Sequence, residues 1–506
     1  MSSAGKSLVT AALCRVFRQD GFSVSPFKSQ NMALNSFVTA DGKEMGRAQV
    51  MQAEACGVEP CVEMNPILLK PTTDLGSQVI VNGDVLGNMS ARDYFAFKKK
   101  LVPDIVKAFR KLEEKSGIIV VEGAGSPAEI NLRENDIVNM GLAEILDSPV
   151  LLVADIDRGG VFAQLLGTVE LLSPDERKRV KGFVINKFRG DKSLLESGIN
   201  YIEEKIKIPC AGVFPYLKVS LDDEDSLTAR FEKNDFDLIN LGVVRLPHIS
   251  NFSDFSVFEN LPGVAVHYIT NPRDAQKMDM IFLPGSKNTL GDLKWLKSRG
   301  FDLEIKKFAK ENPVFGICGG YQMLGISVCD PEGVEEGGEE NALWLLGART
   351  VLKKQKTRTQ VKGKIKIEPP AVSKNYGCPL NDGTSFFDFL SGMSFSGYEI
   401  HMGETELDAK PQKLVSEEKT LGALSGNVAG TYVHGFFDEG NLAALLVQKL
   451  AERKGITASE LKGSSGLEMQ VDFKAFKEKQ YDILATAARE NLDMDKIYKM
   501  LGEAKV

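Results

Sequence analysis

The hydrophobic pattern of the first half of the chain alternates between short apolar runs and longer amphipathic stretches. The short runs have the length and composition of buried strands, and they span 77–81, 117–121, 149–154, 182–185 and 211–214. The stretches between them have the apolar spacing of helices, as in 94–115 and 194–205, where Pro103 predicts a kink or a break in the first. Such alternation predicts a parallel sheet with helices on both faces, which is a doubly wound α/β domain.

A second alternating series follows a charged stretch. Its apolar runs predict further strands at 238–246, 264–269, 280–283 and 314–317, and helical patterns return at 441–454 and 473–501. The region 332–394 is less regular, with short runs such as 363–367. The charged stretch 217–237, which contains the acidic run 222–225, predicts a domain edge. We therefore divide the chain into a first domain (1–220), a linker (221–237), a second α/β domain (238–450) and a helical C-terminal extension (451–506).

Composition narrows the class of protein. With 506 residues the chain is too long for one ordinary core, which predicts two or three domains. The net charge of −7 is small and dispersed, so neither nucleic acid nor a membrane surface is expected as a partner. Seven cysteines without a C-x-x-C pair indicate reduced thiols and a cytoplasmic location, and we find no secretory signal and no apolar run long enough to span a bilayer.

The stretch 313–325 (PVFGICGGYQMLG) predicts an abrupt turn from a buried strand into a helix, with Cys318 at the turn. Gly319 and Gly320 lack the Cβ atoms that would clash there. A thiol at a helix N-terminus is favoured as thiolate, and the amide of Gly319 points where an oxyanion would form. Gly285, at the end of the strand 280–283, is a candidate second amide donor. The alternative is that Cys318 is a small core residue, but such a residue needs no glycine-flanked turn.

A cysteine nucleophile needs a base, and the chain has only four histidines. His434 closes the apolar run 428–433 and precedes Gly435, so it lies at a strand end and is the preferred base, although a satisfied surface histidine would have the same pattern. We assign His248 and His267 structural roles and no chemistry to His401.

The N-terminus carries a Gly5-Lys6-Ser7 tripeptide that opens an amphipathic helix. This is the second half of a phosphate-binding loop, in which Lys6 reaches the phosphate oxygens of ATP and Ser7 ligates Mg²⁺. The first glycine of the motif and the strand before it are missing. Either the chain begins late, from a misplaced start or a truncation, or the loop is only half built.

Polar clusters follow three of the predicted strands, at Glu122–Gly125, Asp155–Gly160 and Asn186–Lys187. The carboxyl ends of strands are where functional residues gather in such sheets. Glu122 and Asp155 are candidate Mg²⁺ ligands, and Asn186 is a candidate nucleotide contact. Each cluster taken alone is equally typical of turn glycines and helix caps.

Several longer motifs resemble the cobyric acid synthase family. They span 27–35 (FKSQNMALN), 45–49 (MGRAQ), 65–71 (NPILLKP), 244–252 (VRLPHISNF), 283–288 (LPGSKN), 317–324 (ICGGYQML), 397–403 (GYEIHMG) and 430–435 (GTYVHG). The resemblance implies an ATPase half similar to dethiobiotin synthetase and a class I glutamine amidotransferase-like half. It further implies ATP- and glutamine-dependent amidation of the b, d, e and g carboxylates of adenosylcobyrinic acid a,c-diamide, a corrinoid, to adenosylcobyric acid.

The motifs of the first half carry Lys28, Arg47 and Lys70, which are candidates to meet the carboxylates of the corrinoid. Class I glutaminases carry a glutamate two residues after the histidine, but Phe436 stands there, as expected of this family, so we predict a Cys–His dyad with His434 oriented by another group. Two alternatives remain: a cobyrinic acid a,c-diamide synthase or related amidotransferase-ligase, and a P-loop nucleotide-switch protein, against which the Cys318 elbow argues. The sequence does not give the oligomeric state.

Overall fold

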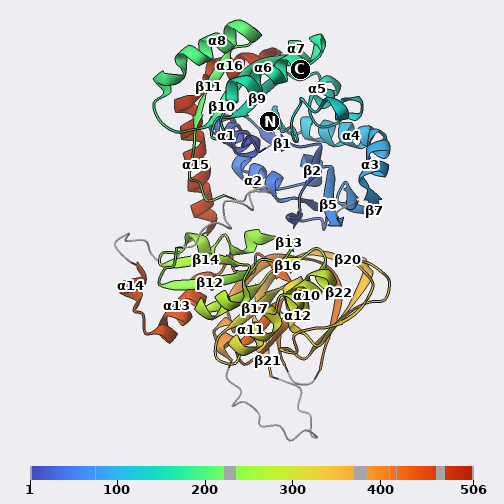
Figure 1. Ribbon diagram of the computed structural model, residues 1–506, viewed down its shortest axis with the longest axis vertical. Helices are drawn as coiled ribbons and strands as arrows, with labels where there is room; N and C mark the ends of the chain where they lie inside the picture. Colours follow the sequence, from blue (N-terminus) through green and yellow to red (C-terminus); the bar gives the residue numbers. More distant parts are fainter. Residues whose placement is uncertain are drawn as a thin grey trace, which may run out of the picture. The chain divides into compact units, whose positions relative to one another are not determined.

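The computed structural model describes residues 3–73, 76–221, 235–369, 385–408, 411–416, 419–462 and 473–503. The chain forms two compact units (Figure 1). Unit 1 consists of Met1–Ala33, Lys43–Glu224 and Lys477–Val506, and unit 2 of Leu34–Gly42 and Asp225–Phe476. The sequence did not anticipate two features of this division: a short N-terminal segment belongs to unit 2, and the C-terminal helices belong to unit 1. Most of the predicted linker, 222–234, lies outside the described residues.

The parallel strands of unit 1 form two hydrogen-bonded groups. One is a pair, β1 (Val24–Phe27) with β8 (Ile118–Val121). The other has the order β11-β10-β9, formed by β9 (Val150–Asp155), β10 (Val180–Phe188) and β11 (Cys210–Pro215). These strands confirm four of the five apolar runs predicted for a parallel sheet. The chain enters its first helix directly from Gly5, without a strand between residues 3 and 5.

The fifth run belongs to a separate sheet of unit 1. That sheet has the order β2-β5-β6-β7, formed by β2 (Gln30–Met32), β5 (Ile67–Thr73), β6 (Gly76–Val81) and β7 (Asp84–Ser90). The prediction of 77–81 as part of the parallel sheet was wrong, because β6 pairs antiparallel with both neighbours. The reason is local: Asn82 and Gly83 both have positive φ, and an Asn-Gly loop of this kind closes a hairpin.

Before the C-terminal tail, unit 1 has helices both inside and outside the stretches predicted as helical. They are α1 (Lys6–Gln19), α2 (Arg47–Cys56), α3 (Ala91–Phe97), α4 (Val102–Glu113), α5 (Met140–Ile145), α6 (Val161–Leu171), α7 (Pro174–Arg179) and α8 (Glu196–Ile206). The predicted helix 94–115 is broken as expected, since α3 passes through a 3₁₀ turn into α4, which holds Pro103 in its first turn.

From Lys477 onward, the C-terminal helices α15 (Phe473–Asn491) and α16 (Met494–Glu503) belong to unit 1 and complete its core. Tyr481 and Leu484 are almost fully buried there. Arg15 of α1 forms ion pairs of 2.8 Å with Glu478 and Asp482. The apolar face of the tail therefore packs against the same core as α1.

Unit 2 is built on an eight-stranded sheet of order β14-β12-β15-β17-β25-β24-β23-β21. Its strands are β12 (Ile239–Val244), β14 (Val264–Ile269), β15 (Met280–Leu283), β17 (Val314–Ile317), β21 (Lys366–Glu368), β23 (Gln412–Val415), β24 (Thr420–Ser425) and β25 (Val428–Thr431). The first five strands in the sheet order pair in parallel, which confirms the predicted α/β class of this half. Its helices are α10 (Thr289–Ser298), α11 (Phe301–Phe308), α12 (Gly319–Leu324), α13 (Leu442–Lys454) and α14 (Ala458–Lys462).

The irregular region of the sequence contributes to a second sheet, of order β19-β18-β20-β22-β26. Its strands are β18 (Ser327–Asp330), β19 (Gly338–Asn341), β20 (Ala348–Lys364), β22 (Ser394–Leu407) and β26 (Val433–His434). The long strand β20 is rich in lysine and arginine, so its sequence has little of the apolar alternation that marks a strand. In the described part of the chain, no helix combines the length and hydropathy needed to cross a bilayer.

Candidate active site

Cys318 lies at the turn between β17 and α12, as the glycine pattern predicts. Its φ and ψ are 52° and −109°, a strained conformation for a residue with a Cβ atom, and it directly precedes the first residue of the helix. A Cβ atom on Gly320 would lie 1.9 Å from the carbonyl oxygen of Leu283, so the turn presses against the end of β15. Cys318 is 7% exposed, and its Sγ atom lies 3.7 Å from the carbonyl oxygen of Ile400, to which the protonated thiol donates.

His434 ends β26 and is 1% exposed. Its Nδ1 atom is 2.8 Å from Oδ2 of Asp254, whose other oxygen accepts a 2.8 Å hydrogen bond from the amide of Gly435. Asp254 lies on a 3₁₀ turn, Phe252–Phe255, and is itself 4% exposed. The group that orients His434 is therefore an aspartate 180 residues earlier in the chain.

The surroundings of His434 favour its cationic form. Burial by itself lowers the pKa of the imidazole, but the charge and hydrogen bond of Asp254 and the hydrogen bond to Cys318 outweigh it and raise the pKa to about 10. At neutral pH the ring is thus an imidazolium beside the sulfur. An imidazolium next to a cysteine is the arrangement found in enzymes that use a thiolate nucleophile.

The two glycines predicted as oxyanion donors lie next to this pair. A Cβ atom on Gly285 would be 3.1 Å from Cε1 of His434, and Gly319 is the first residue of α12. Gly285 pairs with Ser250 in a short antiparallel bridge. A Cβ atom on Gly319 would approach the amide nitrogen of Ser286 to 2.9 Å, so the two glycine-bearing turns are in contact.

The other three histidines have partners of their own. Nδ1 of His248 is 2.8 Å from Asp292, and the ring of His267 is hydrogen-bonded to Asn240 at 3.0 Å. His401 stacks on Tyr432 with 3.8 Å between ring centroids, and its Nδ1 atom is 2.8 Å from the carbonyl of Gly403. These contacts fit structural roles.

In unit 1 the Gly-Lys-Ser tripeptide opens α1 as expected. Gly5 has φ of 78° and precedes the helix, and Nζ of Lys6 donates to the carbonyl of Gly125 at 3.0 Å. Oγ of Ser7 donates to Glu122 at 2.8 Å. The cluster Glu122–Gly125, which follows β8, therefore contacts the phosphate loop at Lys6 and Ser7.

Glu122, at the end of β8, is 2% exposed and accepts hydrogen bonds from three side chains. Besides Ser7, these donors are Lys28 at 3.1 Å and Gln52 at 2.5 Å. A serine hydroxyl beside a carboxylate is the oxygen pair that Mg²⁺ takes from a protein when phosphates supply other ligands. Ser7 and Glu122 therefore fit the predicted metal.

The other two strand-end clusters anchor the start of the chain. Nδ2 of Asn186 donates to the carbonyl of Ala4 at 2.7 Å. Nζ of Lys187 donates both to the carbonyl of Ser3 and to Oδ2 of Asp155, each at 2.8 Å. Asn186 therefore binds the residue just before the loop directly, whereas Asp155 is linked to Ser3 only through Lys187, which also balances its charge.

The two lysines among the candidate corrinoid contacts form buried ion pairs. Lys28 pairs with Glu122, and Nζ of Lys70 is 3.0 Å from Glu44. Arg47 begins α2 and is 8% exposed. The lysines balance buried carboxylates, and their predicted contact with the corrinoid stays a prediction.

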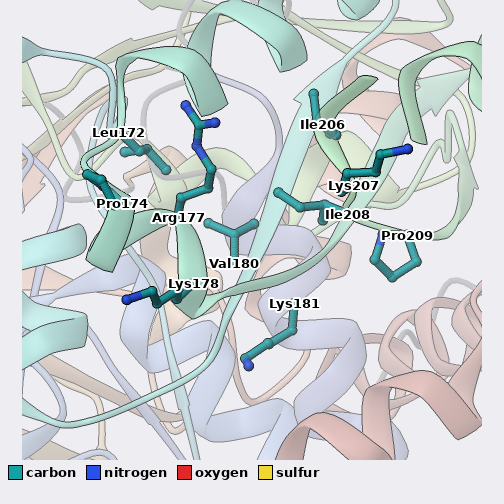
Figure 2. A pocket seen from close by; sticks show the side chains of 10 residues that line it. All are labelled: Leu172, Pro174, Arg177, Lys178, Val180, Lys181, Ile206, Lys207, Ile208 and Pro209. Carbon is teal, nitrogen blue, oxygen red and sulfur yellow. The ribbon is translucent and has the colours of Figure 1, made fainter. Parts of the chain in front are cut away.

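A hollow of about 620 Å³ in unit 1 lies away from these residues (Figure 2). Lys178, Val180 and Pro209 are among the residues that line it. Val180 begins β10 and Pro209 precedes β11, so the hollow is at the amino ends of strands whose carboxyl ends carry Asn186 and its neighbours. Ligands of such sheets bind at the carboxyl ends, so this hollow is not the nucleotide site.

Sequence reasoning missed Asp254. No local spacing links it to His434, because the two are far apart in the chain and only the tertiary fold of unit 2 places the 3₁₀ turn beside β26. The one available signal was its place two residues after the 244–252 motif, which the resemblance had already marked.

Comparison with known proteins agrees with this organisation. Residues 1–227 match the family described as "CobQ/CobB/MinD/ParA nucleotide binding domain", and residues 240–442 match "CobB/CobQ-like glutamine amidotransferase domain". The cobyric acid synthase of Ruminiclostridium cellulolyticum is 51% identical, over 99% of this chain and 96% of that protein. Those of Lachnoclostridium phytofermentans (49%, over 99% and 98%) and Clostridium acetobutylicum (48%, over 99% and 97%) are similar to the same extent.

The fold and the two clusters define a class of enzyme: a glutamine-hydrolysing carbon–nitrogen ligase, with a glutaminase and a nucleotide-binding domain in one chain. More narrowly, the chain belongs to the cobyric acid synthase family. The predicted fold class, enzyme class and glutamine-dependent amidation in cobalamin biosynthesis are confirmed, as is the use of ATP and glutamine. The alternative of a nucleotide-switch protein was wrong.

Proposed function

We propose that this protein amidates the b, d, e and g carboxylates of adenosylcobyrinic acid a,c-diamide, using ATP and the amide nitrogen of glutamine. The observation that carries the proposal is the cluster of Cys318 on its strained turn with His434 and Asp254. It is supported by the Ser7–Glu122 pair at the phosphate loop of the same chain.

In the glutaminase step, the thiolate of Cys318 attacks the amide carbon of glutamine, forming a C–S bond. The C–N bond then breaks, and the His434 imidazolium gives its proton to the departing ammonia. Asp254 holds the ring so that Nε2 faces the reacting atoms and balances its charge. Water, deprotonated by the now neutral imidazole, hydrolyses the thioester to glutamate.

The amides of Gly285 and Gly319 are proposed to stabilise the oxyanion of both tetrahedral intermediates. A Cβ atom at Gly319 would come within 2.9 Å of the amide nitrogen of Ser286, and one at Gly285 would crowd His434 at 3.1 Å, so glycine lets the backbone come close at both positions. Preorganised amide donors are often the largest single contribution to catalysis of acyl transfer.

In the ligase step, a corrinoid carboxylate attacks the terminal phosphoryl group of ATP, and ADP leaves. Ammonia then displaces phosphate from the acyl phosphate. Lys6 neutralises the charge of the phosphoryl group, and Asn186 holds the loop in place through Ala4. Ser7 and Glu122 are the residues that would hold Mg²⁺, which stabilises negative charge on the phosphates. Asp155, which is linked to the start of the chain through Lys187, is the third candidate ligand.

The test is to incubate the protein with ATP, Mg²⁺, cobyrinic acid a,c-diamide in its adenosyl form, and glutamine with a heavy-nitrogen amide. Mass spectrometry then counts the labelled amides in the product. Labelling of all four carboxylates supports the proposal. A parallel incubation replaces the a,c-diamide with cobyrinic acid. Labelling only there, at a and c, identifies the alternative diamide synthase, and label in neither substrate refutes both. The cytoplasmic location expected from the cysteine pattern stays a prediction.

A further inference from the structure

A short segment from the first half of the chain lies in the core of unit 2. Residues Leu34–Gly42, which include β3 (Ser36–Val38), belong to unit 2, although the chain on both sides belongs to unit 1. Asn35 and Ser36 are 2% and 1% exposed. A polar pair buried to this extent must be hydrogen-bonded there.

One set of contacts from this segment holds Tyr398 of β22. The hydroxyl of Tyr398 donates a 2.9 Å hydrogen bond to the carbonyl of Ser36, and the ring of Phe37 meets that of Tyr398 edge-on with 5.1 Å between centroids. The ring of Tyr398 in turn stacks on the imidazole of His434, at 5.5 Å and 26°. The segment therefore fixes the side chain that lies on the candidate base.

A second set of contacts holds the turn that carries Asp254. The amide of Ser36 donates to Oδ1 of Asn251 at 3.0 Å, and Oδ1 of Asn35 accepts from the amide of Phe252 at 3.2 Å. Asn251 has φ of 52° and begins the 3₁₀ turn, where its carbonyl accepts from the amide of Asp254 at 3.1 Å. Both partners of the His434 ring, the carboxylate and the stacked tyrosine, thus depend on the same three residues.

We propose that Asn35–Phe37 is a positioning element for His434, acting through Tyr398 and Asn251. It fixes the plane of the His434 ring and the position of the Asp254 carboxylate, so that Nε2 of His434 faces the sulfur of Cys318. The inference rests on the proposed glutaminase mechanism and adds to it a part from outside the amidotransferase-like half of the sequence. Misplacement of a catalytic group by about 1 Å is enough to cost about a hundredfold in rate.

The test uses the full chain and three variants. Tyr398→Phe removes the hydrogen bond to Ser36 but keeps the ring on His434, Tyr398→Leu removes both, and Phe37→Ala removes the edge contact. Phe386→Ala is the matched control, because Phe386 is equally half-buried in unit 2 and packs on Phe387 and Phe389.

We expect the kcat of glutamine hydrolysis to fall about tenfold in Tyr398→Phe and Phe37→Ala and about a hundredfold in Tyr398→Leu, with the KM for glutamine within about twofold of wild type. In these variants the high-pH limb of the kcat/KM profile moves to lower pH, because a weaker contact with Asp254 raises the pKa of His434 less. Amidation supplied with free ammonia stays at the wild-type rate, since it bypasses the glutaminase.

The positioning role is overturned if the three variants behave like Phe386→Ala, or if ammonia-dependent amidation falls in parallel with glutamine hydrolysis, as a folding defect would cause. Either result leaves the proposed function standing, provided the wild-type protein releases glutamate. A wild-type protein that does not hydrolyse glutamine refutes the proposed function itself.

Discussion

Replacement of Asp254 by asparagine tests the electrostatics of the candidate glutaminase directly. Asp254 accepts two hydrogen bonds, one on each oxygen, from His434 and from the amide of Gly435. An asparagine of the same shape has only one acceptor oxygen. If that oxygen keeps the amide of Gly435, its NH2 group faces Nδ1 of His434 and holds the neutral ring with its proton on Nε2, which is the wrong tautomer for the imidazolium-dependent step. The variant also removes the negative charge beside the imidazolium.

The expected size of the effect follows from the distance. Unit charges 2.8 Å apart attract by about 6 kcal/mol at an effective dielectric constant of about 20, equivalent to about four pKa units. This is slightly more than the net rise of the pKa of His434 from 6.5 to about 10, as expected when burial opposes the attraction. Without the charge, burial is opposed only by the contact with Cys318, so the pKa of His434 falls and the ring loses its proton at a lower pH than in the wild type.

The consequence is a loss of glutaminase activity that depends on pH. The imidazolium of the wild type is fully present below pH 6.5 and is lost as the pH rises through about 10. In Asp254→Asn the imidazolium is lost at lower pH than in the wild type, because the charge that opposes burial is gone. At pH 7.5 we expect kcat/KM for glutamine to fall by about 10²–10⁴, the range seen when the residue that orients a catalytic histidine is replaced.

The assay is glutamate release from pH 5 to 10, together with the rate of alkylation of Cys318 by iodoacetamide over the same range. Asp330→Asn is the control, because Asp330 is 1% exposed in the same unit and accepts hydrogen bonds from the backbone amides of Val334, Glu335 and Gly337. Asp254→Asn should keep ammonia-dependent amidation. A high-pH limb that coincides with that of the wild type, or a loss under tenfold, would refute the reasoning.

Three further variants probe other parts of the molecule. Cys318→Ala should abolish glutamine hydrolysis and leave ammonia-dependent amidation at the wild-type rate; residual glutamate release would contradict the assigned nucleophile. Lys6→Ala should lower ATP-dependent amidation at least about a hundredfold with glutaminase activity retained, measured as ADP formed per corrinoid, and unchanged ADP formation would exclude the loop as the nucleotide site. Gly320→Ala places a Cβ atom 1.9 Å from the carbonyl oxygen of Leu283, so we expect a lower midpoint of thermal unfolding and loss of glutaminase; an unchanged midpoint would show that the turn can relax.

The sequence by itself determined the elements whose cause is local. The Cys318 turn was predictable because glycine is required where backbone segments approach this closely, and the phosphate loop because a Gly-Lys-Ser tripeptide opens a helix in the way that phosphate binding requires. The break at Pro103 followed from the missing backbone donor of proline. In each case the physical reason lies within a few residues, so a pattern in the sequence is enough.

Tertiary structure decided the partners that come from a distance. Asp254 reaches His434, and Ser36 reaches Tyr398, only because strands from separate parts of the chain pair and pack in unit 2. A hydrogen bond between residues 180 or more positions apart leaves no periodicity in the sequence. The sequence thus determined which residue is the candidate nucleophile, and only the fold determined what holds its base in place.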